Sequence, residues 1–215
     1  MMSHPVSVGP LALPGALAMP PGATGLVLFA HGSGSGRGSP RNRAVANALQ
    51  RWRFGTLLFD MLTESEARQR ENVFDIALLA QRLLQALDWS RAGAAVQGLP
   101  FGIFGAGLGA AAALVASAER PSAVAALVAR GGRPDLAGPA LADVRTPTLL
   151  IVGGADAEVL QLNRAAYARL SCEKQFEIVP RATHLFAEAG AMETVARLAR
   201  DWFGSHFGNP GARDA

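Results

Sequence analysis

An aspartate and a histidine in the second half of the chain have the residue types of a catalytic base and the acid that orients it. Asp156 follows an apolar run at 147–152, and His184 follows another at 175–179. In open parallel sheets, ligands bind beyond the carboxyl ends of the strands, so side chains that follow neighbouring strands meet at one edge. We expect Asp156 to hold the His184 imidazole in one tautomer and to stabilise its protonated form.

Both residues also have a structural interpretation. Asp156 could be the N-cap of the helix that follows it, because a short carboxylate accepts hydrogen bonds well from first-turn amides. An isolated histidine is more often structural than catalytic. The position of His184 beyond the last strand, with Asp156 beyond the preceding one, favours the catalytic interpretation.

The segment Phe104-Gly-Ala-Gly-Leu-Gly109 has the form of a nucleophile elbow, a sharp turn from a strand into a helix. Small residues must flank the nucleophile in such a turn, and Gly105, Ala106 and Gly109 meet that requirement. The middle position, where a serine or cysteine would attack, is Gly107. Because glycine has no side-chain nucleophile, a covalent intermediate cannot form there. Glycine also tolerates a positive φ, which strains other residues by about 1–3 kcal/mol.

A glycine-rich loop, His31-Gly-Ser-Gly-Ser-Gly36, follows the apolar run at 25–30. We expect backbone N–H groups around Gly32 and Ser33, together with that of Leu108 after the elbow, to bind an oxyanion. His31 is expected to shape this loop rather than to transfer protons. The loop lacks the lysine of a phosphate-binding loop, which argues against a nucleotide site.

Other polar residues follow strands at the same edge. Asp60 could cap a turn or assist at the edge of the cleft, and it is the nearest candidate for an acid that binds a ribose. Arg130 and Arg133 could contact an anionic substrate, although arginines beside a Gly-Gly turn are more often solvated. Ser33 and Ser35 are weak candidates for a substitute nucleophile, since serines in such loops usually bond to the backbone.

Strand and helix patterns alternate along the chain and must position these residues. Short apolar runs predict strands at 25–30, 55–60, 100–105, 124–128, 147–152 and 175–179, with helices between them. An alternating segment at 6–19 predicts an N-terminal β-hairpin that turns at Pro14-Gly15. The order indicates a doubly wound, mostly parallel sheet of about 7–8 strands. We expect a single domain over 1–207, a frayed tail over 208–215, and no large lid.

Composition limits the function classes. The chain has 215 residues, half of them hydrophobic, and a net charge of +3. Its apolar blocks are shorter than the roughly 20 residues of a membrane span, and it lacks a signal peptide, so a soluble cytoplasmic protein is expected. No dense basic tract suggests nucleic-acid binding. The histidines show no metal-ligand spacing, so neither metal nor cofactor is expected; nothing indicates an oligomeric state.

Elbow, acid and histidine follow one another in the order of the α/β-hydrolase triad. The chain resembles the dienelactone-hydrolase-like branch of these proteins over nearly its whole length. The resemblance rests on Leu28-Phe-Ala-His-Gly-Ser-Gly34, Phe104-Gly-Ala-Gly-Leu-Gly109, Ile151-Val-Gly-Gly-Ala-Asp156 and Ala182-Thr-His-Leu-Phe186. It implies an α/β-hydrolase fold and descent from ester or lactone hydrolases that act on small carbonyl compounds.

Gly107 leaves three hypotheses. In the first, His184 and Asp156 work without a nucleophile, activating water or abstracting a substrate proton in lyase, isomerase or cyclisation chemistry. In the second, the chain is a pseudoenzyme that binds a ligand in the old cleft. In the third, an esterase has been deliberately inactivated or redesigned. Leu108, an unusual neighbour for a nucleophile, argues against a single knockout.

Overall fold

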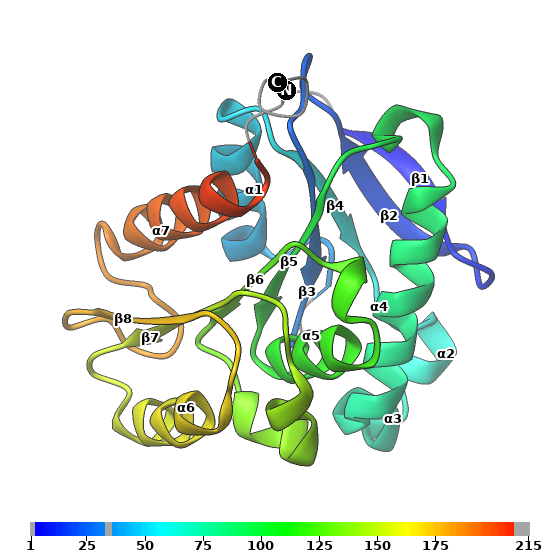
Figure 1. Ribbon diagram of the computed structural model, residues 1–215. Coiled ribbons are helices and arrows are strands. Elements are labelled where there is room, and N and C mark those ends of the chain that lie inside the picture. Colours follow the sequence, from blue (N-terminus) through cyan, green and yellow to red (C-terminus); the bar gives the residue numbers. More distant parts are fainter. Residues whose placement is uncertain (1–2, 33–35, 209–215) are drawn as a thin grey trace.

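The apolar runs of the sequence form the strands of one sheet in the computed structural model, which describes residues 3–32 and 36–208 (Figure 1). Within these residues the sheet has eight strands in the order β1-β2-β4-β3-β5-β6-β7-β8. The strands are β1 (His4–Val8), β2 (Leu13–Ala18), β3 (Leu26–Ala30), β4 (Gly55–Phe59), β5 (Phe101–Ala106), β6 (Ala126–Arg130), β7 (Thr148–Gly153) and β8 (Lys174–Val179). β2 pairs antiparallel with both β1 and β4, and the other pairs are parallel. The predicted mostly parallel sheet with an N-terminal hairpin is confirmed.

Helices cover both faces of the sheet (Figure 1). The α-helices are α1 (Pro40–Arg51), α2 (Glu64–Ala67), α3 (Arg70–Phe74), α4 (Ile76–Arg91), α5 (Leu108–Glu119), α6 (Ala157–Arg169) and α7 (Ala191–His206). Three 3-10 segments are η1 (Ala94–Val96), η2 (Pro121–Ala123) and η3 (Pro134–Asp143). Helices α1 and α7 pack on one face, and α4, α5 and α6 contribute to the core of the other. Only η3 separates β6 from β7, so the cleft has no lid domain there, as predicted.

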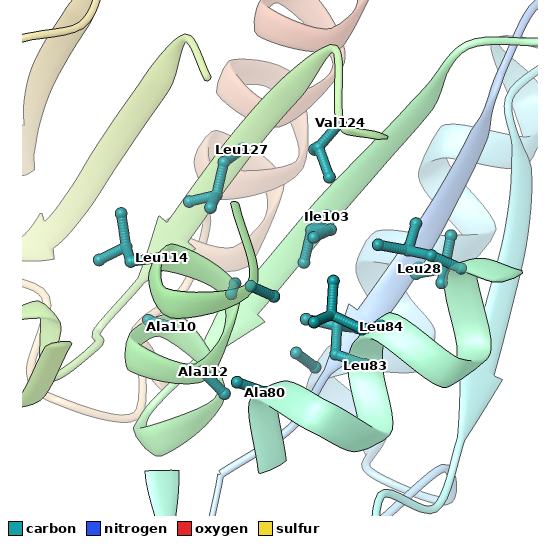
Figure 2. Packing of buried hydrophobic residues seen from close by; sticks show 14 of the residues in the cluster. Leu28, Ala80, Leu83, Leu84, Ile103, Ala110, Ala112, Leu114, Val124 and Leu127 are labelled. Atoms are coloured by element: carbon teal, nitrogen blue, oxygen red, sulfur yellow. The ribbon is translucent and has the colours of Figure 1, made fainter. Parts of the chain in front are cut away.

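Two apolar cores follow from the alternation of side chains along the central strands. Leu28 and Ile103 face α4 and α5, where Leu83 is completely buried (Figure 2). Phe29 and Phe104 face the opposite side, and their rings lie 5.2 Å apart beneath α1 and α7. Because both faces are covered, the central strands are continuously apolar rather than alternating.

The turn of the N-terminal hairpin differs from the prediction. The chain reverses at Gly9–Ala12, where the Ala12 N–H donates to the Gly9 carbonyl at 3.1 Å and both residues have positive φ. Pro14 and Gly15 lie inside β2, opposite Ser7 and Val6. The prediction of a turn at Pro14-Gly15 was wrong because proline is tolerated near the start of a strand, where its missing N–H does not interrupt the ladder.

Two predicted boundaries also shift. The helix expected from residue 72 is interrupted, and α4 begins only after Asp75, whose carboxylate caps it by accepting from the Leu78 N–H at 2.9 Å. Strand β6 begins two residues later than expected and ends at Arg130. The predicted frayed tail at 208–215 falls, from residue 209 on, outside the described residues.

Membrane-spanning segments were sought in residues 3–32 and 36–208. No helix there has both the length and the apolar character needed to cross a bilayer.

Candidate active site

The elbow between β5 and α5 is built by glycines that allow backbone segments to touch. A Cβ added to Gly105 would lie 2.7 Å from the Ala110 Cα, and one added to Gly109 would lie 2.1 Å from the carbonyl oxygen of Ala30. Real Cβ atoms do not approach so closely, so the turn admits no side chain at either position. Helix α5 is thereby pressed against the carboxyl end of β3.

Gly107, at the position predicted for a nucleophile, has a positive φ of 58° and a ψ of −125°. Among the described residues, a Cβ added there would meet only the Gly32 Cα, at an ordinary contact distance of 3.4 Å. The carbonyl of Gly107 accepts from the N–H groups of Ala110 at 3.2 Å and Arg133 at 3.1 Å, which fixes the elbow to the loop after β6. The position therefore has room for a side chain, and glycine's advantage there is its tolerance of the positive φ.

Two of the residues proposed to bind an oxyanion, Gly32 and Leu108, lie close together. Leu108 is the first residue of α5, so its N–H has no acceptor within the helix. A Cβ added to Gly32 would lie 3.4 Å from the Leu108 nitrogen, which places Gly32 against the elbow. The two other loop candidates, Ser33 and Ser35, lie outside the described residues.

His184 and Asp156 meet beyond the ends of β7 and β8. The His184 Nδ1 donates to the Asp156 Oδ2 at 2.8 Å, which leaves Nε2 as the free basic nitrogen. The other carboxylate oxygen, Oδ1, accepts from the Val159 N–H at 3.4 Å and caps α6. Asp156 thus makes both of the contacts considered for it, the bond to His184 and the helix cap, and its catalytic role stays a prediction. Its side chain is 14% exposed, whereas that of His184 is 51% exposed and open to a ligand.

The loop that carries His184 is fastened at both sides. The Ala155 N–H donates to the Ala182 carbonyl at 3.0 Å, which ties the loop to the turn after β7. On the other side, the Glu188 carboxylate accepts from the Thr183 hydroxyl at 2.7 Å and from its N–H at 3.1 Å. The hydroxyl bond from Thr183 is the main reason that the pKa of Glu188 lies below its ordinary value. No motif in the sequence marked Thr183 or Glu188 as supports of the site.

His31 connects the glycine-rich loop to the chain after β4. Its Nδ1 donates to the Gly32 carbonyl at 3.1 Å, and its Nε2 accepts from the Met61 N–H at 3.3 Å. This pair of bonds requires the neutral imidazole, with one donor and one acceptor nitrogen. Burial lowers the pKa of His31, while the Gly32 carbonyl and the Asp60 charge act weakly in the opposite direction.

This geometry predicts that acid loosens the loop. A histidine whose pKa is lower in the folded than in the unfolded chain stabilises the fold above the unfolded pKa of about 6.5, and that contribution is lost as pH falls toward the folded pKa. We expect the free energy of unfolding, measured by urea titration between neutral and mildly acidic pH, to fall less steeply in His31→Asn than in the native chain. His4→Asn, an exposed control on β1, should leave the slope unchanged. Equal slopes for the native chain and His31→Asn would contradict the prediction.

Asp60 holds the far end of the glycine-rich loop. Its Oδ1 accepts from the Arg37 N–H at 2.9 Å, and its carboxylate forms an ion pair with the Arg37 guanidinium. A cavity of about 490 Å³ opens beside this pair and beside His31 and Gly32. Its lining combines polar residues, among them His31, Arg37, Asp60 and Glu64, with the apolar Met61, Leu62, Ala67, Val73 and Leu79.

The two arginines after β6 differ in their surroundings. Arg133 is partly exposed and pairs with Asp135 at 2.8 Å, and this hydrogen bond holds the pKa of Arg133 above its ordinary value. Arg130 is only 6% exposed. The expectation of a solvated Arg130 was therefore wrong, because the strand extends to residue 130 and turns its side chain under α1. Within residues 3–32 and 36–208, no cluster of three His, Cys, Asp or Glu residues could hold a metal ion.

Comparison with solved structures identifies similar proteins. No family model matches the sequence. The crystal structure of dienelactone hydrolase from Anabaena variabilis is 53% identical, with 96% of this chain and 97% of that chain covered and a TM-score of 0.92. Est1E from Butyrivibrio proteoclasticus has a TM-score of 0.78 over 96% of this chain and 99% of its own, but at 14% identity it shows a common fold only.

Longer relatives are found among curated sequences. Proteins from two strains of Mycobacterium tuberculosis, provisionally named phosphoribosyl transferases, are 53% identical to this chain over 206 residues. The match covers 96% of this chain but 46% of theirs, so the chain spans about half the length of these relatives.

Proposed function

Because the chain belongs to the dienelactone hydrolase-like α/β-hydrolases, we propose that its cleft acts on a small carbonyl compound through acid/base catalysis by His184, without a covalent intermediate. One observation carries the proposal: the 2.8 Å bond between His184 Nδ1 and Asp156 Oδ2, with the half-exposed imidazole leaving Nε2 free. A base oriented in this way needs no serine in order to accept a proton from water or from a substrate carbon.

In hydrolysis, His184 Nε2 takes a proton from a water molecule as its oxygen bonds to the substrate carbonyl carbon. The carbonyl π electrons move onto oxygen, and this oxyanion is bound by the Leu108 N–H and by donors in the loop near Gly32. Asp156 stabilises the imidazolium. When the tetrahedral intermediate collapses, His184 returns the proton to the departing ester or lactone oxygen. With a proton beside the carbonyl, the same groups would support enolisation for lyase, isomerase or cyclisation chemistry.

His184→Ala tests this chemistry. We expect the rate on an unsaturated γ-lactone or an activated ester such as 4-nitrophenyl acetate to fall about 10²–10⁴-fold, the usual contribution of a positioned base. Because His184 is half exposed, the melting temperature should change little. His4→Ala serves as the control, and it should keep the native rate. Unchanged turnover in His184→Ala would contradict the proposal.

Gly107 favours a second candidate function, a pseudoenzyme that binds a carbonyl compound in the cleft without turnover. Such a module would bind the same lactone equally well in the native chain and in His184→Ala, and neither protein would release product. Binding by calorimetry, compared with turnover, separates the two functions. We propose that the phosphoribosyl transferase activity in the name of the longer relatives belongs to the part of those proteins that this chain does not match.

A further inference from the structure

Arg130 is a buried cation at the rim of the candidate active site. It is the last residue of β6 and lies opposite Ala106, which directly precedes the elbow glycine. Its guanidinium carbon lies 5.5 Å from the centre of the Phe186 ring, in the loop that carries His184. Only 6% of the residue is exposed, and its Nε has no hydrogen-bond partner within the described part of the chain.

The groups around Arg130 are neutral or positive. Its Nη2 donates to the amide oxygen of Asn42 at 3.4 Å, in the first turn of α1. That turn contains no acidic residue, and a helix N-terminus carries a partial positive charge. Arg41, in the same turn, also has a buried Nε without a partner in residues 3–32 and 36–208. Neither guanidinium forms an ion pair with a described residue, and Ser33-Gly34-Ser35 of the loop has no carboxylate to offer.

Burying a positive charge without a counter-charge is costly, and proteins normally pair such groups. Burial and the neighbouring Arg41 charge lower the pKa of Arg130 to about 10, so the guanidinium remains charged at neutral pH. Arg130 and Arg41 therefore lie at the N-terminus of one helix, and no carboxylate among residues 3–32 and 36–208 pairs with either guanidinium.

We propose that Arg130, Arg41 and the N-terminal turn of α1 form a binding site for a carboxylate or phosphate group. Arginine suits both groups, because its planar fork donates two parallel hydrogen bonds to a pair of anionic oxygens. The site lies between the elbow strand and the His184 loop. We infer further, on the basis of the proposed function, that the bound anion is part of the substrate. The substrate would then be a carbonyl compound that carries a negatively charged group.

The site is tested by binding, without reference to turnover. Inorganic phosphate and acetate are added separately to the native chain at constant ionic strength, with chloride as the reference, and the melting temperature is followed. At about tenfold excess over its dissociation constant, the preferred anion should raise the melting temperature by roughly 3–6 °C. A response to phosphate assigns a phosphorylated ligand, and a response to acetate assigns a carboxylate.

Arg130→Met should abolish this rise, and without added anion it should be as stable as the native chain or more so, since it removes an unpaired buried charge. If that variant does not fold, Arg41→Met, at a partly exposed residue, should still reduce the rise in melting temperature. Arg43→Met, at an exposed residue of the same helix, is the control and should preserve the rise. An equal rise in Arg130→Met and the native chain would overturn the site, as would the absence of any response to both anions. Because no catalytic step is measured, this result is separate from that of His184→Ala.

Discussion

Gly107→Ser is expected to give the protein esterase activity about 10³-fold above that of the native chain, well below the roughly 10⁶-fold that the serine of an optimised triad contributes. Among residues 3–32 and 36–208, a Cβ at this position meets only the Gly32 Cα, at 3.4 Å, so these residues leave space for a serine side chain. It would stand at the N-terminus of α5, beside the Leu108 N–H, in the elbow geometry that exposes a nucleophile. Hydrolysis of 4-nitrophenyl acetate and stoichiometric labelling by a fluorophosphonate measure the gain.

Gly107→Ala is the matched control for this experiment. It introduces the same strain at a φ of 58°, about 1–3 kcal/mol, but no nucleophile. It should lose stability to a similar extent and show no esterase activity above that of the native chain. Adding His184→Ala to Gly107→Ser should remove the new activity, because the serine then has no base. A folded Gly107→Ser that neither hydrolyses the ester nor reacts with the probe would show that His184 does not serve this elbow.

The sequence was sufficient for the fold because its signals were local. Apolar runs closed by glycine gave the parallel strands, and their order placed Asp156 and His184 beyond neighbouring strands. The two residues do meet, at 2.8 Å. Predicting this needed only the rule that parallel strands end at one edge of the sheet.

The environment of Arg130 could not be predicted because it depends on the register of β6. The segment Val-Ala-Ala-Leu-Val-Ala-Arg at 124–130 is apolar at every position except the last, so it has no alternation from which to assign faces. Ending the strand at Val128 leaves Arg130 in a loop. Extending it by two residues buries the same arginine beneath α1.

His31 illustrates a second limit. Its protonation state is set by two backbone partners, Gly32 beside it and Met61 thirty residues further along. Only the assembled sheet brings the Met61 N–H within hydrogen-bond distance of His31. The sequence therefore indicates a histidine in a glycine-rich loop but does not indicate which tautomer it adopts. Glu188 differs, because its bonds to Thr183 join residues only five apart, but no sequence motif marks this loop conformation.

Gly109→Ala is expected to be the most destabilising single methyl addition in the elbow. The new Cβ would lie 2.1 Å from the Ala30 oxygen, 2.4 Å from its carbonyl carbon and 2.8 Å from the His31 oxygen. These are backbone atoms of β3 and the glycine-rich loop, so no side-chain rotation relieves the clash. Helix α5 must move away from the sheet, at a cost of about 3 kcal/mol or more.

Gly204→Ala is the matched control, because Gly204 also lies in a helix, α7, and its added Cβ would meet nothing closer than the Phe54 ring at 3.9 Å. Alanine there should stabilise the protein by up to about 1 kcal/mol through helix propensity. Urea unfolding should thus give opposite signs for the same chemical change. Equal effects would mean that α5 is not held against β3. The contact that brings Leu108 and Gly32 together would then be looser than the structure indicates, and the oxyanion site would have to form on ligand binding.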